Sequence, residues 1–430
     1  MNDARDEGLL RVIGLGGLTG SVINVVIGGG IFALPAALAA TLGPASPLAF
    51  LLGAAVMGLV TLSLARAGSR VARSGGVYAY AAEAFGPLAG FLTGVLFLSA
   101  GVLSNASIAA ALVDSLSLVA PAAAQPVWRG TALVGLYAVL AWVNLRGVAT
   151  GTRVAAGLAA VKFSALSLFV LFGMGLVHPE HLAWSATPAA DALGRSAILG
   201  IFAFAGMEIA LGASGEVRDP ARTIPRALVL AMTLIVLLYV AIQLVAQGIL
   251  GPDLAASRAP LAEALGRGWK QGRPFMLVLG AVSMLGWMAG DVLGSSRQFF
   301  AFAREGFFPG PLGAIHPRSR VPHIAILCYA AMGCTLAITG TFAGLAILAS
   351  VAVILLYLSG CAAAWRLARE AQSLPWLVPS LASAGLLWVL SSATGKEFLA
   401  VAGVLGASLL LYRLTRTRRQ TVARAAPDAG

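Results

Sequence analysis

Three ionisable side chains interrupt the apolar stretches of this chain, and they are the residues best suited to chemistry. Lys162 and Glu208 each lie within an apolar run, and Asp291 is near the middle of residues 275–303. A charged side chain at membrane depth costs free energy and is by default a functional-site hypothesis. Lys162 has two open roles, which are proton exchange and donation to carbonyls freed by a broken helix. Asp291 also has two, which are a buried ion pair with Lys162 and contact with a cationic substrate.

The backbone offers a second kind of chemistry in residues 21–35, SVINVVIGGGIFALP, where Gly28, Gly29 and Gly30 are consecutive. Glycine disfavours helix by about 1 kcal/mol relative to alanine, so a helix opens readily here. Unpaired backbone groups at membrane depth are tolerated only inside protein or along a wet cavity, which indicates a binding site. The alternative is that the glycines only let helices pack closely.

Residues 202–215, FAFAGMEIALGASG, again combine glycines with an apolar run, which disfavours regular helix. Two interrupted helices at corresponding positions of two five-span halves indicate a transporter built from inverted repeats. Asn105 and Trp287 are expected to act in packing, unless Trp287 lines the cavity, and Asp114 lies nearer the outer end of its span.

The composition requires membrane helices to position these groups. Hydrophobic residues make up 59% of the 430-residue chain and charged residues 11%, whereas soluble domains have roughly 25% charged residues. Because a span needs about 20 apolar residues, we expect an all-α integral membrane protein with about 12 transmembrane helices. The expected spans are residues 12–40, 46–65, 86–118, 130–145, 154–177, 196–215, 225–250, 275–300, 322–340, 343–365, 374–393 and 397–414.

These spans predict one transporter domain over residues 1–414. It would contain inverted repeats at roughly 12–177 and 196–365, additional helices at 374–414, and then a basic tail at 415–430.

The net charge of +12 does not indicate nucleic-acid binding, because most of the 29 Lys and Arg residues fall in alternate loops between the expected spans. An even number of spans puts both termini on the side with this excess. By the positive-inside rule, we expect a multi-pass protein of the cytoplasmic membrane with both termini cytoplasmic. The basic tail is expected to contact anionic lipid.

The cysteines and histidines do not suggest an enzyme or a metal site. Three cysteines inside apolar runs provide no disulfide framework and no metal-ligand spacing. The four histidines lie at span ends or in loops, namely His178, His181, His316 and His323. We therefore expect no cofactor, no metal and no enzymatic activity.

Four motifs in order carry a family resemblance: IGGGIFALP, SGGVYAY with AFG, FAFAGMEIA with GEVRDPARTIPRAL, and SSRQFFAFAREGFFP with VPHIA. Over the first ten expected spans, the chain resembles the amino acid–polyamine–organocation (APC) superfamily of permeases. This resemblance implies the LeuT-type 5+5 fold, with helices 1 and 6 broken, and transport of amino acids or related amines. Gly29 departs from the pattern, since a serine or threonine is frequent there. We expect the small residues Gly29 and Ala205 to leave room for a bulky side chain.

The resemblance also implies which residues act. Freed carbonyls accept from an ammonium group and amide groups bind a carboxylate, so the glycine stretch would hold the α-amino and α-carboxylate groups. Phe202 matches an aromatic gate, and Lys162 matches a lysine linked to proton coupling, with Glu208 a second candidate. The expected substrate-binding residues are Val26, Gly28, Gly29, Gly30, Phe202, Ala205, Gly206 and Asp291. If Asp291 is ionised and faces the substrate, we expect a preference for arginine, lysine or a polyamine.

The sequence therefore predicts a secondary active transporter that moves amino acids by alternating access, with proton-coupled symport. An exchanger of amino acids or polyamines is the alternative; a channel or membrane scaffold would not need paired helix breaks. The expected partners are an amino acid or related amine, protons and membrane lipid, and no nucleic acid. The pattern does not indicate an oligomeric state.

Overall fold

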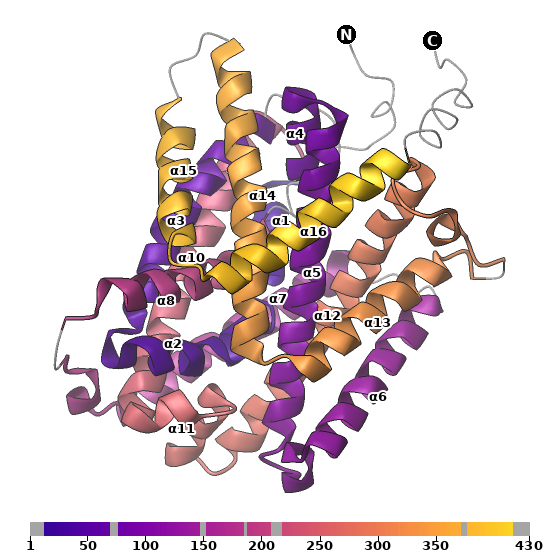
Figure 1. Cartoon of the computed structure of the whole chain (residues 1–430). Helices are drawn as coiled ribbons and strands as arrows, with labels where there is room; N and C mark the ends of the chain where they lie inside the picture. Colours follow the sequence, from indigo (N-terminus) through magenta and orange to yellow (C-terminus); the bar gives the residue numbers. More distant parts are fainter. Residues whose placement is uncertain are drawn as a thin grey trace.

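The computed structural model describes residues 13–68, 76–146, 152–184, 187–207, 217–317, 319–370 and 376–415. These residues form α-helices joined by short turns and 3₁₀ segments, as Figure 1 shows. In these ranges the only extended pairing is an isolated bridge between Ile13 and Val217, so the described chain contains no sheet. The all-α prediction is confirmed.

The helices are rich in apolar side chains, and most are separated by few residues. In chain order they are α1 (Leu15–Val26), α2 (Leu34–Leu42), α3 (Pro47–Gly68), α4 (Gly76–Phe85), α5 (Pro87–Leu116), α6 (Pro126–Leu145), α7 (Thr152–Gly173), α8 (Ala190–Phe204), α10 (Pro220–Leu250), α11 (Pro260–Gly268), α12 (Gly272–Arg304), α13 (His323–Thr339), α14 (Phe342–Glu370), α15 (Leu377–Leu390) and α16 (Gly395–Leu414). Within the described ranges, seven segments are long and apolar enough to cross a membrane, and they lie along α3, α5, α6, α10, α12, α14 and α16. Shorter apolar helices lie along α1, α2, α7, α13 and α15.

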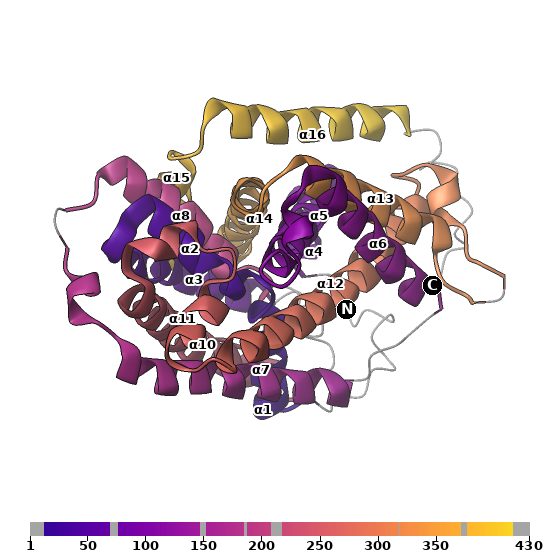
Figure 2. The same ribbon diagram turned by 90° about the horizontal axis from the view of Figure 1, so that it is seen from below.

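The helices pack into one body in which the broken segments lie inside. α5 runs along α14 and also contacts α12, while α3 contacts α8 and α10. Figure 2 shows α7 and α16 on opposite sides of the molecule, with α5, α12 and α14 between them. α7 packs against α1 and α10, whereas α16 packs against α5 and α14.

The first expected span is not one helix. α1 ends at Val26, and Ile27 adopts ψ 67°, so that the Gly28 amide donates to the Val26 carbonyl at 2.7 Å in a tight turn. Helical bonding resumes only in the 3₁₀ turn Gly30–Phe32, and α2 follows. The opening expected at the glycines is thus observed.

A second interruption follows α8. Ala205 is extended, with ψ 148°, and Gly206 has φ +108°, a conformation that favours glycine. A Cβ atom on Gly206 would lie 3.0 Å from Cγ1 of Val25, so the backbone after α8 runs directly against the end of α1. The two openings therefore adjoin each other.

An aromatic cluster packs against the end of α8. The rings of Phe50, Phe204 and Tyr239 come from α3, α8 and α10, and their centroids are 5.6 to 6.4 Å apart. Aromatic pairs at such separations contribute about 0.5–1.5 kcal/mol beyond the area they bury. The last residue of α8 is thereby fixed against two other helices.

Candidate functional site

A cavity lies where the two helix breaks meet, and it encloses about 620 Å³ of space including its opening. Its walls come from the end of α1, the following glycines, the end of α8, and faces of α5, α10, α12 and α14. The lining residues are Val25, Val26, Gly28, Gly29, Gly30, Ile31, Phe97, Ala100, Gly101, Ser104, Ile108, Phe202, Ala203, Ala205, Gly206, Tyr239, Trp287, Asp291 and Val353.

Every residue that the sequence proposed for substrate binding lies in this wall. They are Val26, Gly28, Gly29, Gly30, Phe202, Ala205, Gly206 and Asp291. Segments far apart in the sequence are therefore brought together at one cavity, while contact of these residues with a substrate stays a prediction. Lys162 is not part of the wall, and Glu208 lies outside the described residues.

The glycine end of the cavity presents backbone groups. In the described part of the chain, no hydrogen bond engages the amide groups of Gly29 and Gly30, so both remain available to an anion. The Val26 carbonyl is already occupied, since it accepts from the Gly28 amide and from the Tyr239 hydroxyl, the latter at 3.0 Å. The Gly28 carbonyl accepts from the Ser283 hydroxyl at 3.3 Å.

Gly29 does not leave room for a bulky substrate, and that expectation is wrong. A Cβ atom at this position would lie 2.6 Å from Cγ2 of Ile108 and 2.6 Å from Cγ of Met284. Side chains of α5 and α12 already fill the space, so glycine is required for close packing. Gly29 lets side chains of α5 and α12 pack against the backbone, so it does not widen the cavity here.

Aromatic side chains flank the same glycines. Phe202 lies against Gly30, where an added Cβ atom would be 3.0 Å from its Cε1, and its ring meets that of Phe342 edge-on at 6.0 Å. Trp287 lies against Gly28, where an added Cβ atom would be 2.8 Å from Cδ1 of the indole. Trp287 therefore lines the cavity and does not merely pack between helices.

Asp291 is held by three donors from three helices. Asn105 of α5 donates to Oδ2 at 2.8 Å, the Tyr329 hydroxyl of α13 donates to the same oxygen, and Ser295 of α12 donates to Oδ1 at 3.2 Å. The Tyr137 hydroxyl donates to Oδ1 of Asn105 at 3.0 Å, which orients the amide toward Asp291. Asp291 is half-buried as a residue and lines the cavity wall.

The buried ion pair between Lys162 and Asp291 is not formed. Both side chains are described, and no ion pair joins them. Lys162 is on α7, which packs against α1 and α10, while Asp291 is on α12 and satisfied by neutral donors. Two roles were expected for Asp291, an ion pair with Lys162 and contact with a cationic substrate. Only the second agrees with this geometry.

Lys162 is 6% exposed, and no hydrogen bond or ion pair within the described ranges engages its ammonium group. Its helix contacts α1, the helix that opens at the glycines. Asp114 does not line this cavity, and it pairs with Arg129 at 2.7 Å. Among the described residues, no three His, Cys, Asp or Glu side chains gather as a metal site.

Sequence reasoning missed several residues of the wall. Phe97, Gly101, Ser104 and Ile108 of α5 face the cavity at spacings of three and four residues, which place them on one helical face. The only hint in the sequence was Asn105, a polar residue within this apolar span, which indicates contacts to other helices. Tyr239 and Tyr329 gave no such signal, because each is a lone aromatic residue in an apolar run.

Comparison with known proteins agrees with this arrangement. Residues 13–412 match the family model described as amino acid permease. An uncharacterized transporter of Mycobacterium tuberculosis is 33% identical over 95% of this chain and 91% of its own length. The methylthioribose transporter of Bacillus subtilis is 29% identical over 74% of this chain and 73% of its own length. The branched-chain amino acid permease BcaP of the same organism is 26% identical over 77% and 75%.

The family match spans both helix breaks and every wall of the cavity, and the relatives are transporters and permeases. The apolar helices agree with a multi-pass membrane protein. The chain therefore belongs to the amino acid permease family, within the APC superfamily that its motifs resemble.

Proposed function

We propose that this chain is a secondary active transporter that moves amino acids across the cytoplasmic membrane by alternating access about the cavity. The observation that carries the proposal is the meeting of two interrupted helices at one cavity, where the Gly29 and Gly30 amides have no hydrogen-bond partner in the described chain. Membership of the amino acid permease family supports the substrate class. Unwound backbone inside a membrane protein is characteristic of such transport sites.

The proposed binding mode follows from the backbone chemistry. The α-carboxylate would accept hydrogen bonds from the amides of Gly29 and Gly30, which have no partner within the described chain. The α-ammonium group would donate to the Gly28 carbonyl, which accepts one hydrogen bond from Ser283 and has a second lone pair, and to the Tyr239 hydroxyl oxygen, which lies in the wall. Phe202, beside Gly30, would cover the bound amino acid.

For the whole chain we propose the LeuT-type arrangement of about 12 spans, with both termini and the basic tail cytoplasmic. In this arrangement α1 with α2 would be the first broken span, and α8 would begin the second. The long helices α3, α5, α6, α10, α12, α14 and α16 provide further spans.

We propose proton coupling through Lys162. Lys162 is buried and no carboxylate of the described residues pairs with it, so its charge costs free energy and its protonation would differ between conformations of the carrier. Because α7 packs on α1, gain or loss of that charge would affect the opened helix directly. Glu208 remains a second candidate for this role.

The test uses the purified full chain in proteoliposomes, with uptake of a mixed set of labelled amino acids measured with and without an inward proton gradient. Wild type is compared with Lys162→Met, which retains an apolar stem of similar length without the charge. Lys396→Met, at an exposed position, is the matched control.

The proposal expects saturable uptake that the gradient accelerates and that Lys162→Met, but not Lys396→Met, uncouples from it. Uptake that ignores the gradient and requires internal amino acid would indicate an exchanger and would refute proton symport. A complete lack of saturable uptake for every amino acid would refute the transport proposal.

A further inference from the structure

The carboxyl group of Asp291 lies in the cavity wall, and in the described part of the chain no basic side chain is paired with it. Asn105, Tyr329 and Ser295 reach its two oxygens, and hydrogen bonds donated to a carboxylate favour its ionised form. Within the described ranges, no Lys or Arg side chain forms an ion pair with it. A charge in this setting is costly unless a partner of opposite sign is supplied.

One oxygen of Asp291 remains open to the cavity. Oδ2 accepts from both Asn105 and Tyr329, whereas Oδ1 accepts only from Ser295. A Cβ atom on Gly101 would lie 3.3 Å from Oδ1, and both residues line the cavity. The absence of a side chain at Gly101 thus leaves that face of Oδ1 uncovered.

The distance from the glycine end sets the length of ligand that could reach this oxygen. Trp287 touches Gly28 and precedes Asp291 by one turn of α12, which corresponds to about 6 Å along the helix axis. An amino acid whose α-groups lie at the glycines would need a long side chain to span that interval. Trp287 also lines the cavity, and an indole ring suits an aliphatic stem or a cation.

We propose that Asp291 is a recognition site for the positively charged end of the substrate's side chain, so that the carrier accepts amino acids with long basic side chains. The inference rests on the proposed function, because it takes the α-groups to bind at the glycine end. Neutral amino acids would leave the Asp291 carboxylate without a cationic partner. Shorter cations would not reach both ends of the cavity.

The experiment measures uptake of labelled arginine by the full chain in proteoliposomes and its competition by unlabelled compounds. Citrulline has nearly the shape of arginine without the charge, and agmatine is arginine without the α-carboxylate. We expect lysine and ornithine to compete, and citrulline and agmatine to compete weakly. Asp291→Asn should lower the preference for arginine over citrulline by about thirtyfold or more, as loss of a buried charge partner does.

A second variant leaves the carboxylate in place. Gly101→Ala would set a methyl group 3.3 Å from Oδ1 and 3.1 Å from the Ser295 hydroxyl, so it should also reduce the preference for arginine. Gly290→Ala, next to Asp291 but with nothing within 4 Å of the added Cβ atom, is the matched control and should retain the preference.

The outcomes separate the two proposals. Saturable uptake of neutral amino acids, with citrulline competing as well as arginine in wild type, would overturn this inference and leave the proposed function intact. An arginine preference that survives both Asp291→Asn and Gly101→Ala would also overturn it, because the charge would then be recognised elsewhere. A lack of saturable uptake for every amino acid would overturn the proposed function and this inference with it.

Discussion

The hydroxyl of Tyr239 donates a hydrogen bond of 3.0 Å to the carbonyl oxygen of Val26, the last residue of α1. Tyr239 is 1% exposed, and its ring packs against Phe50 and Phe204. One side chain of α10 therefore joins the opened end of α1 to the aromatic cluster that holds the end of α8. The shape of the cavity depends on this connection.

Tyr239→Phe is expected to lower stability by about 1 kcal/mol, since it leaves the Val26 carbonyl with one donor fewer in a buried setting. Because the hydroxyl also lines the cavity, the KM for substrate should rise several-fold. Thermal unfolding in detergent and uptake kinetics measure the two effects. Wild-type values for both quantities in Tyr239→Phe would contradict the proposed role.

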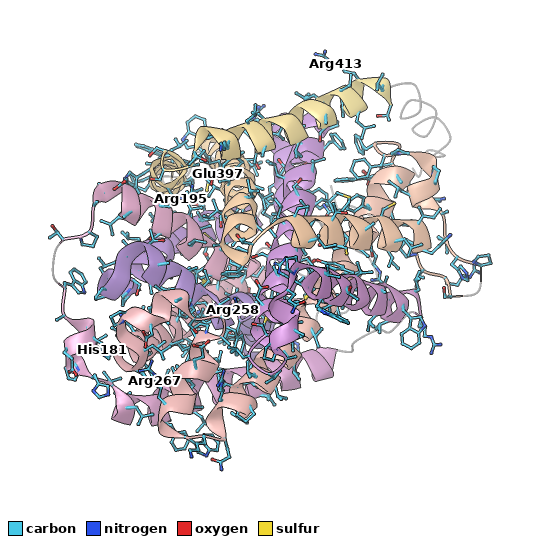
Figure 3. The ribbon with its side chains drawn as sticks, turned by 60° about the horizontal axis from the view of Figure 1, so that its bottom comes forward. His181, Arg195, Arg258, Arg267, Glu397 and Arg413 are labelled. Carbon is cyan, nitrogen blue, oxygen red and sulfur yellow. The ribbon has the colours of Figure 1, made fainter. Side chains whose placement is uncertain are left out.

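The start of α16 offers a stability test far from the cavity. Glu397 binds Arg195 of α8 at 2.6 Å and accepts from the Thr394 amide at 2.8 Å, forming a capping box. Figure 3 shows Arg195 and Glu397 beside each other where these two helices meet. The pair thus links a peripheral helix to the one that ends at the cavity.

Glu397→Ala removes both the cap and the ion pair and should cost about 1–2 kcal/mol. Glu397→Gln can still accept from the Thr394 amide and should cost less, because only the charge is lost. Thermal unfolding of the purified chain measures the difference, with the exposed Lys396→Ala as a control. Equal losses for the two Glu397 variants would show that the cap contributes nothing.

Hydropathy and glycine placement were enough to predict the long apolar helices and both openings, but not the short helices α4 and α11, which fall outside the expected spans. An apolar run has few structural options in a membrane, and consecutive glycines weaken helix wherever they occur. The motif positions then brought Gly28, Phe202 and Asp291 to one place, and all three line the cavity. The helices and openings depend on local sequence, whereas the meeting of Gly28, Phe202 and Asp291 was implied by the family resemblance.

Contacts across helices could not be read in the same way. Pairing Lys162 with Asp291 followed from depth alone, but depth does not say which faces of two helices meet. In the structure Asp291 accepts hydrogen bonds from Asn105 and Tyr329. The sequence does not show the register or the rotation of α13, so the contact with Tyr329 could not be predicted. The prediction of free space at Gly29 was wrong for a related reason. The space beside a glycine can be filled by side chains of other helices, and the sequence does not show which ones pack there.

The packing at Gly29 gives the last prediction. Gly29→Ala would place a methyl group 2.6 Å from Cγ2 of Ile108 and from Cγ of Met284, and such overpacking costs about 1–3 kcal/mol. Ile108→Ala removes one of the two obstructing groups but leaves a cavity of its own. In a double-mutant cycle, the combined variant should therefore lose less stability and less uptake than the two single losses added together. Gly58→Ala, with nothing within 4 Å of the added Cβ atom, should be silent. Simple additivity of Gly29→Ala and Ile108→Ala would mean that the close approach of α5 does not set the identity of residue 29.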